Sequence, residues 1–290
     1  MKAFVFPGQG SQKTGMGQSL YNEVVESRPL FKKANKILNF NITELMFEGT
    51  SEDLLQTKVT QPAIFIHSVI LALTSKSFIP DVCAGHSLGE FSALVASNSI
   101  SFEDGLKLVS IRANAMQKAC NITTGAMAAI VGLSNDIIES SCNDIDGIVK
   151  PANYNCPGQL VISGDIIAVE KVCRILKEKG AKRALILPVS GAFHSELMNS
   201  AVSELKKGIN ETKFKKPSCP IYQNFTGNSE QEPSKIKINL LKQLTGPVLW
   251  SQSIQKMIED GVKELYEVGP GNILQGLIKK IDRNIVVDKI

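Results

Sequence analysis

The chain has 290 residues, of which 43% are hydrophobic and 21% charged, and its formal net charge is +4. This composition is typical of a globular protein with a large core and excludes a disordered chain, and so small a positive charge predicts no nucleic-acid partner. No apolar run approaches the ~20 residues of a membrane-spanning helix, so we expect no membrane association.

The six cysteines are scattered without a Cys-x-x-Cys pair, and the three histidines are equally dispersed. This spacing offers no zinc site, so we expect no metal and reduced thiols. The sequence opens directly on an expected strand, with no signal or transit segment. We therefore expect a cytoplasmic protein, with the plastid stroma as the alternative for a chain of plastid origin.

In the first half of the chain, strands and helices alternate. A strand is expected at residues 2–6, followed by a sharp glycine-containing loop. Two helices are expected next, at about 19–39 and 62–76. The second has Pro62 in its first turn. A short buried strand then leads into a tight turn, and two more helices follow it, at about 90–96 and 103–119.

Residues 123–192 have a rhythm of their own, which reads β-α-β-β-α-β. This is the order of a ferredoxin-like unit. We therefore predict an α/β protein in which a ferredoxin-like subdomain, residues 123–192, is inserted into a larger parallel-sheet domain made of residues 1–122 and 193–290. After the insertion we expect a helix at about 195–210, strands near 219–223 and 263–268, and a final helix.

The segment Gly85-His86-Ser87-Leu88-Gly89 fits Gly-x-Ser-x-Gly, the pattern of a nucleophile elbow. An apolar strand precedes it and an apolar helix follows it, which is the context that the motif requires. Glycines on both sides remove side chains that would clash in so tight a turn. Ser87 is therefore the candidate nucleophile, with the Leu88 amide as an oxyanion donor. The alternative is a glycine-rich turn whose serine only caps a helix.

A nucleophilic serine needs a base, and only three histidines are available. His67 lies in an apolar helical run, which favours a satisfied core or helix-face histidine over a catalyst. His86 adjoins Ser87, so its side chain should leave the turn in another direction and shape the elbow. By elimination His194, which follows an apolar strand, is the candidate base, since sites collect at strand ends in α/β sheets.

Two further features are open to two interpretations each. The loop around Gly8-Gln9-Gly10 fits neither the dinucleotide nor the P-loop pattern, so it is a plain turn or a source of a second oxyanion donor, the Gln9 amide. Arg112 lies on the apolar stripe of its helix, where a guanidinium needs a carboxylate. That carboxylate belongs either to the protein or to a substrate bound in a bidentate manner.

Taken together, the motifs resemble the malonyl-CoA:acyl carrier protein transacylases. The matching segments keep their order from end to end and include Phe6-Pro7-Gly8-Gln9-Gly10-Ser11-Gln12, Thr60-Gln61-Pro62-Ala63, Gly85-His86-Ser87-Leu88-Gly89-Glu90, Asn153-Tyr154-Asn155-Cys156-Pro157-Gly158, Gly191-Ala192-Phe193-His194-Ser195 and Glu267-Val268-Gly269-Pro270-Gly271. The resemblance implies a large α/β-hydrolase-like core with a ferredoxin-like subdomain. The chain departs from the pattern at two places, at Ala113 beside the key arginine and at Asn98-Ser99 at the end of the elbow helix.

The resemblance also implies a role for each matching residue. Ser87 corresponds to the nucleophile and His194 to its base, whose orientation the backbone carbonyl of Gln243 sets. The amides of Gln9 and Leu88 correspond to the oxyanion hole, and Arg112 to the partner of the malonyl carboxylate. Three further residues correspond to positions in the cleft: Asn153, Asn155 and Phe193. Phe193 is expected to crowd an α-methyl group and so to favour malonyl over methylmalonyl.

The function that the resemblance implies is malonyl transfer from malonyl-CoA to the phosphopantetheine thiol of acyl carrier protein, in the service of fatty acid synthesis. It proceeds through a malonyl-serine intermediate by a ping-pong mechanism. No cofactor is implied, because malonyl-CoA is a substrate and phosphopantetheine belongs to the partner, and a monomer is expected. The alternatives are a serine esterase or thioesterase of α/β-hydrolase type, an acyltransferase of a polyketide pathway, and a non-catalytic carrier-binding scaffold. An esterase would place its histidine late in the chain, and here no histidine follows residue 194.

An acyl carrier protein of this kind of pathway is acidic, and two stretches of the chain are basic. They include Lys171, Arg174, Lys177, Lys179, Lys182 and Arg183 in the first, and Lys206, Lys207, Lys213, Lys215 and Lys216 in the second. Such runs often form only a solvated helix face. The first stretch leads into the strand before His194, so it is the candidate docking surface.

Overall fold

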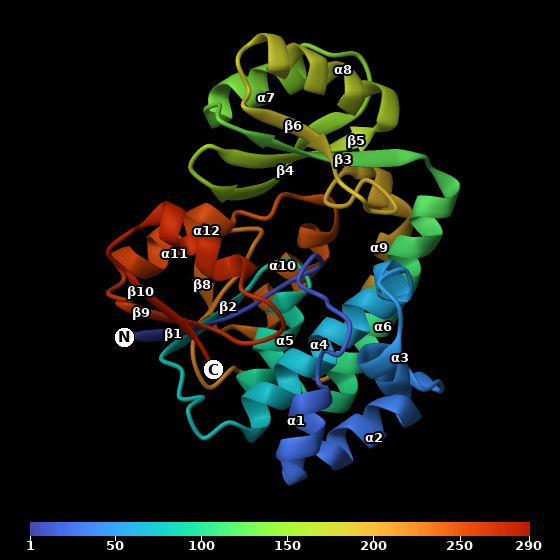
Figure 1. Ribbon diagram of the computed structural model, residues 1–290, viewed down its shortest axis with the longest axis vertical. Helices are drawn as coiled ribbons and strands as arrows, with labels where there is room; N and C mark the ends of the chain where they lie inside the picture. Colours follow the sequence, from blue (N-terminus) through green and yellow to red (C-terminus); the bar gives the residue numbers. More distant parts are fainter.

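Two separate sheets organise the computed structural model, which describes residues 1–290 (Figure 1). The larger is the core sheet, whose strands lie in the order β10-β9-β1-β2-β7-β8 and are parallel except for the antiparallel pair β7 and β8. Their bounds are Lys2–Phe6 for β1, Val82–Gly85 for β2, Ile221–Tyr222 for β7, Ser229–Glu230 for β8, Glu264–Glu267 for β9 and Val286–Lys289 for β10.

Helices cover both faces of the core sheet, as its two-sided apolar strands require. Alternate residues of β1 face opposite sides: Phe4 and Phe6 pack into one hydrophobic cluster, Ala3 and Val5 into another. The first cluster draws on α2 (Arg28–Leu38), α3 (Ile42–Glu48), α4 (Thr57–Thr74), α5 (Gly89–Ala96), α6 (Phe102–Ile122), α9 (Asn199–Glu211) and α10 (Pro233–Thr245). The second draws on α11 (Trp250–Glu259) and α12 (Ile273–Ile281).

The smaller sheet forms a lobe, residues 125–186, at the top of Figure 1. Its four strands are antiparallel in the order β4-β5-β3-β6, and the chain order is β-α-β-β-α-β, as the sequence predicts. The bounds are Gly125–Val131 for β3, Asn135–Asn143 for α7, Val149–Cys156 for β4, Gln159–Asp165 for β5, Ile166–Glu178 for α8 and Arg183–Ile186 for β6.

The lobe has an outer and an inner face. The two helices α7 and α8 cover the outer face and enclose a hydrophobic cluster of their own with β3 and β5 (Figure 1). On the inner face Met127 and Val161 join the core of the larger body. Two backbone hydrogen bonds fasten β4 to the segment before α11: Tyr154 donates to Val248 at 2.9 Å, and Val248 donates to Ala152 at 2.8 Å.

Several predicted bounds are wrong. The helix expected at 19–39 is two helices, α1 (Gln18–Glu23) and α2, because the chain is extended at Val24 and Pro29 starts a new helix. Pro62 lies inside α4 rather than in its first turn, and the surrounding residues are all buried. Packing of this helix outweighs the loss of one backbone hydrogen bond. The sequence favours a strand over residues 183–189 as the last of the β-α-β-β-α-β order, but the strand ends at Ile186, just before Pro188, which has no N–H.

The sequence-based interpretation omits α3, α10, α11, β8 and β10 altogether. No helix combines the length and the apolarity that crossing a bilayer demands.

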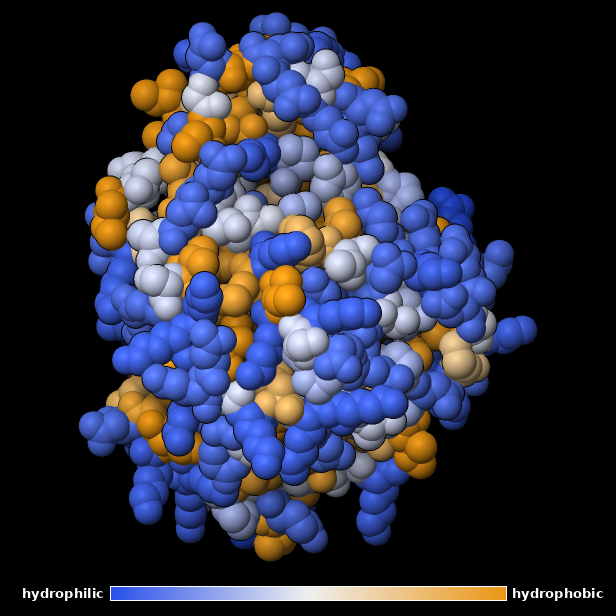
Figure 2. Space-filling view, turned by 180° about the vertical axis from the view of Figure 1, so that it is seen from behind, coloured by the Kyte–Doolittle hydropathy of each residue, from blue (hydrophilic) through white to orange (hydrophobic).

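From behind, hydrophobic residues gather in a strip where the lobe meets the larger body, and most of the surrounding surface is hydrophilic (Figure 2).

Candidate active site

The turn between β2 and α5 has the geometry of a nucleophile elbow. Ser87 adopts a φ of 52°, in the left-handed region that non-glycine residues rarely occupy. A Cβ at Gly85 would lie 1.8 Å from the carbonyl carbon of Gly89, and one at Gly89 would lie 2.0 Å from the Phe6 oxygen. Only glycine therefore fits at both positions.

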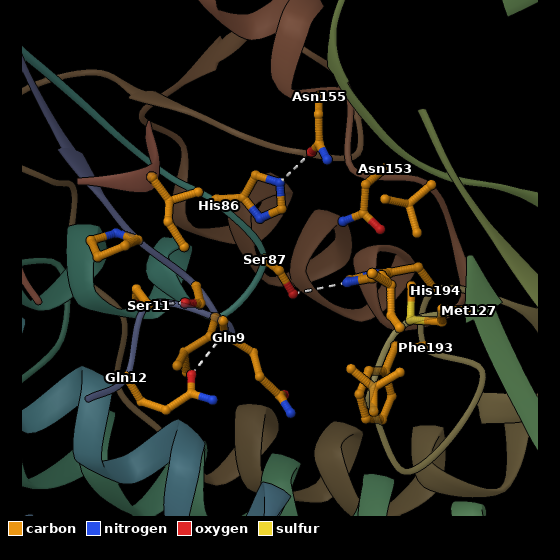
Figure 3. A pocket seen from close by; sticks show the side chains of 18 of the residues that line it. Gln9, Ser11, Gln12, His86, Ser87, Met127, Asn153, Asn155, Phe193 and His194 are labelled. Carbon is orange, nitrogen blue, oxygen red and sulfur yellow. Dashed lines mark hydrogen bonds between the residues drawn. The ribbon is translucent and has the colours of Figure 1, made fainter. Parts of the chain in front are cut away.

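Ser87, His194 and Gln243 form a hydrogen-bonded chain. The Ser87 Oγ lies 2.8 Å from the His194 Nε2, and the His194 Nδ1 lies 2.8 Å from the Gln243 backbone oxygen (Figure 3). Because a carbonyl only accepts, Nδ1 carries the proton, and Nε2 is left to accept from the serine hydroxyl. The site thus holds a serine hydroxyl and a histidine nitrogen that can accept its proton, with the imidazole oriented by a neutral carbonyl.

His194 is buried and has a φ of 60°, so this residue too is held in a strained conformation. Burial and the nearby Arg112 charge lower its pKa to about 3. The imidazole is therefore neutral near pH 7, which is the form that can take a proton from Ser87.

Two backbone amides near Ser87 have no partner in the chain. The Leu88 and Gln9 N–H groups donate no hydrogen bond, whereas the Ser87 N–H is bound by the Asn224 Oδ1 at 2.6 Å. Gly8 allows the loop of residues 7–12 to approach, since a Cβ there would lie 2.4 Å from the His86 oxygen. Figure 3 shows Gln9 beside Ser87, on the side away from His194. Two free amides in this position are an arrangement that can bind an oxyanion.

Arg112 is 1% exposed, and no protein carboxylate hydrogen-bonds it. Its Nη1 donates to the Gln61 Oε1 at 2.7 Å, and its Nη2 to the Ser87 Oγ at 3.0 Å and the Gln243 Oε1 at 3.2 Å. Its Nε is buried without a partner. Burial lowers the pKa of Arg112 to about 10, so the group stays charged near neutral pH. The interpretation that a direct protein ion pair satisfies it is therefore wrong.

These groups open into one cavity of about 470 Å³ between the lobe and the larger body. The inner face of the lobe supplies an apolar wall, while the loop of residues 7–12 and α12 supply the opposite side. The sequence-predicted site residues Gln9, Ser87, Leu88, Arg112, Asn153, Asn155, Phe193 and His194 all line this cavity. Gln243 does not line it and lies wholly buried behind His194.

The structure separates the roles of the remaining candidates. His86 turns away from Ser87 and its Nε2 lies 2.9 Å from the Asn155 Oδ1 (Figure 3). Asn153 lies on the His194 side, and its side chain makes no hydrogen bond within the chain. His67 lies in α4 and does not line the cavity, so it takes no part in the site; its Nδ1 is buried without a partner, so that atom is not satisfied.

The acyl transferase domain model matches residues 3–285 of this chain. A curated malonyl CoA-acyl carrier protein transacylase of Staphylococcus aureus strain MW2 is 40% identical over 99% of this chain and 94% of its own length. The chain belongs to this transacylase family. It is therefore an acyltransferase.

Solved structures agree with this assignment to the transacylase family. An acyl carrier protein S-malonyltransferase from Vibrio cholerae superposes with a TM-score of 0.95, at 41% identity over 100% of this chain and 96% of its own. A malonyl-transacylase in complex with a type II PKS acyl-carrier protein has a TM-score of 0.96, at 38% identity over 100% and 95%. The shared α/β fold therefore extends over the whole chain.

For this transacylase family member, sequence reasoning missed the buried polar residues behind the elbow. Glu90, Gln223 and Asn224 are wholly buried, and the Glu90 carboxylate accepts hydrogen bonds from Gln223, Asn224 and Gln243. Gln61 belongs to one of the matching motifs, but the sequence assigns it no role; its Oε1 accepts a hydrogen bond from the Arg112 Nη1. A charged residue in an otherwise apolar helical sequence, as Glu90 is in α5, is the sequence signal that points to this group.

Proposed function

We propose that the chain transfers the malonyl group of malonyl-CoA to the phosphopantetheine thiol of an acyl carrier protein, through a malonyl ester on Ser87. The observation that carries this proposal is the buried, charged Arg112, which has no carboxylate partner and lies 3.0 Å from the Ser87 Oγ. A free carboxylate on the acyl group would supply the missing partner. The names of the relatives support the same substrates.

In the first half-reaction His194 accepts the proton of Ser87 at Nε2, while the serine oxygen attacks the thioester carbon. The carbonyl oxygen becomes negatively charged and rests on the amides of Gln9 and Leu88. The carbon–sulfur bond then breaks, and the CoA sulfur leaves with the proton that His194 holds. The product is a malonyl-Ser87 ester and free CoA.

The second half-reaction reverses these steps with another thiol. The phosphopantetheine thiol gives its proton to His194 and attacks the ester, and Ser87 leaves with that proton. Arg112 keeps the acyl carboxylate in one place through both halves, which orients the ester toward the incoming thiol. We propose that Phe193 crowds the α-carbon and disfavours a methyl branch, and that Asn153 and Asn155 face the pantetheine arm. No step uses a cofactor.

The strand orders support the finer description of the fold. We propose an α/β-hydrolase-like core of residues 1–122 and 193–290 with an inserted ferredoxin-like subdomain of residues 123–192. The parallel strands β9-β1-β2-β7 support the first part, and the antiparallel order β4-β5-β3-β6 with two helices on one face supports the second.

A polyketide carrier is the second candidate partner, because one structural relative was solved with a type II PKS acyl-carrier protein. An esterase function has less support, since His194 is oriented by a carbonyl and no carboxylate.

The function is tested by intact mass. After mixing with malonyl-CoA we expect a malonyl adduct that is stable to water for minutes and is discharged when a holo acyl carrier protein is added. Fatty acid and polyketide carriers are compared at equal concentration. An adduct that water removes at once indicates an esterase, and no adduct would contradict the proposal.

Arg112→Ala is expected to lower the rate constant of malonylation by about 10²-fold or more, since the acyl carboxylate loses its charged partner. Acetylation from acetyl-CoA should be unchanged or faster, because acetyl has no carboxylate. Single-turnover acylation with each thioester measures both rate constants. Equal losses for the two substrates would show that Arg112 acts only in the structure.

We further propose that Lys182 and Arg183 help to dock the acidic carrier. Lys182 immediately precedes β6, an edge strand of the lobe, and Arg183 is its first residue. The chain after β6 passes through Leu187, Pro188 and Val189, which line the cavity. The other basic residues of the first stretch lie on or just after α8, which covers the outer face of the lobe, away from the cavity.

Changing Lys182 and Arg183 to Glu is expected to raise the KM for the carrier several-fold at low salt, with the difference fading as salt screens the charges. The malonyl-CoA half-reaction should change little. Lys206→Glu with Lys207→Glu on α9 is the matched control, because it makes the same charge change on a helix that does not line the cavity. Superimposable salt curves for the two pairs would place the docking surface elsewhere.

A further inference from the structure

Glu90 is a carboxylate with no assigned part in the reaction. It is the second residue of α5, three residues after Ser87, and its side chain is 0% exposed. A buried carboxylate is costly unless several hydrogen bonds compensate it. The presence of Glu90 in the core, directly behind the turn that carries Ser87, therefore calls for a structural or functional explanation.

Three N–H groups donate to the Glu90 carboxylate. The Gln223 Nε2 lies 2.8 Å from Oε1, and the Asn224 backbone N and the Gln243 Nε2 lie 2.8 Å and 3.0 Å from Oε2. No Lys or Arg hydrogen-bonds it; burial raises the pKa of the Glu90 carboxyl, and the three donors and the more distant Arg112 charge oppose that rise. Because every neighbour donates, the arrangement suits the ionised form, which only accepts.

Two of these donors lead directly to the reacting groups. The Gln243 Oε1 accepts from the Arg112 Nη2 at 3.2 Å, and its Nε2 also donates to the Ser87 backbone oxygen at 3.0 Å. The Asn224 side chain spans the elbow: its Oδ1 accepts from the Ser87 N at 2.6 Å, and its Nδ2 donates to the Gly85 oxygen at 2.6 Å.

The orientation of the Gln243 amide is the decisive point. If the amide were turned over, its NH₂ would face the Arg112 guanidinium and its oxygen would face Glu90, so both contacts would be repulsive. An acceptor-only group behind Gln243 fixes the orientation that Arg112 requires.

We propose that Glu90 is a positioning residue for acyl transfer. Its carboxylate sets the Gln243 amide, and through it the Arg112 guanidinium, while its bond to the Asn224 backbone secures the residue that braces the Ser87 turn. This inference rests on the proposed function and assigns no contact between Glu90 and the substrate.

The test measures single-turnover acylation with malonyl-CoA and with acetyl-CoA, and reports the malonyl preference, the ratio of the two rate constants. Malonylation of the wild-type protein comes first, because its absence would overturn the proposed function and this inference with it. Glu90→Gln keeps the shape but removes the acceptor-only character. We expect it to lower the malonylation rate constant at least tenfold and the malonyl preference at least fivefold.

Glu267→Gln is the matched control. Glu267 is equally buried and accepts two backbone amides at the start of α12, from Leu274 and Gln275, but none of its bonds involves Arg112 or the elbow. Its malonyl preference should equal that of the wild type. If Glu90→Gln also leaves the malonyl preference unchanged, Glu90 is merely structural and the proposal is overturned. The same holds if Glu90→Gln lowers both rate constants equally and the loss is explained by a lower melting temperature of the variant.

A double-variant cycle shows whether Glu90 acts through Arg112. In an Arg112→Ala background the Glu90→Gln change should no longer alter the malonyl preference, and an effect of full size there would overturn the proposal. If Glu90→Gln does not fold, Gln243→Met tests the same connection, since it keeps the backbone carbonyl but removes the amide. An unchanged malonyl preference in Gln243→Met would again overturn the proposal.

Discussion

Ser87→Ala is expected to abolish the covalent malonyl adduct and to reduce carrier malonylation to the uncatalysed level. The serine oxygen is the atom that attacks the thioester, and no other hydroxyl lies within hydrogen-bond distance of His194. Intact mass after incubation with malonyl-CoA measures the adduct, and single-turnover transfer to the carrier measures the rate.

Ser92→Ala is the matched control for this change. Ser92 lies in the same helix that follows the elbow, is wholly buried, and its Oγ has no hydrogen-bond partner. Its removal should leave the adduct and the rate close to those of the wild type. An adduct that persists in Ser87→Ala would contradict the entire assignment of the site.

His194→Ala is expected to lower the malonylation rate constant by about 10³-fold or more, because the serine loses its proton acceptor. The double variant with Ser87→Ala should be no worse than Ser87→Ala alone, since the two residues act as one unit. A loss of less than tenfold in His194→Ala would assign the base to another group.

The pKa of His194 adds a pH signature to the second prediction. A base acts when it is neutral, so activity is present above the pKa and is lost as the pH falls through it. With that pKa lowered to about 3, the wild-type acylation rate should stay flat from about pH 8 to about pH 5. A limb near the ordinary histidine value of about 6.5 would indicate that burial does not depress this pKa in solution.

The sequence predicts the parts of the site whose signals are local. The elbow can be predicted because glycine, serine and glycine occupy fixed places between a strand and a helix. His194 is identified as the candidate base by elimination among three histidines. The β-α-β-β-α-β order of the lobe is legible because its polar turns separate short apolar runs. The comparisons confirm the family, while the roles of the individual residues remain predictions.

What the sequence does not show depends on contacts between distant segments. The partners of Arg112 come from residues 51 and 131 positions away, Gln61 and Gln243, so the buried guanidinium suggested a carboxylate where the structure supplies two amides. Strand β10 exposes most of its residues and is a strand only because β9 pairs with it. The buried residues of α11 do recur at helical spacing, at Trp250, Ser253, Ile254 and Met257, so this helix does carry a local signal in the sequence.

The nucleophile and its base follow strands of different sheets. Ser87 follows a central strand of the core sheet, whereas His194 follows the loop that leaves β6, an edge strand of a lobe with its own hydrophobic cluster. Partial unfolding that frees the lobe would release the loop of residues 187–193 and so disturb the base, although Phe193 packs in the larger body, while the serine stays on an intact sheet. In rising denaturant, loss of acyl transfer is therefore expected to precede loss of the helical signal of the larger body, so that activity reports the integrity of the lobe.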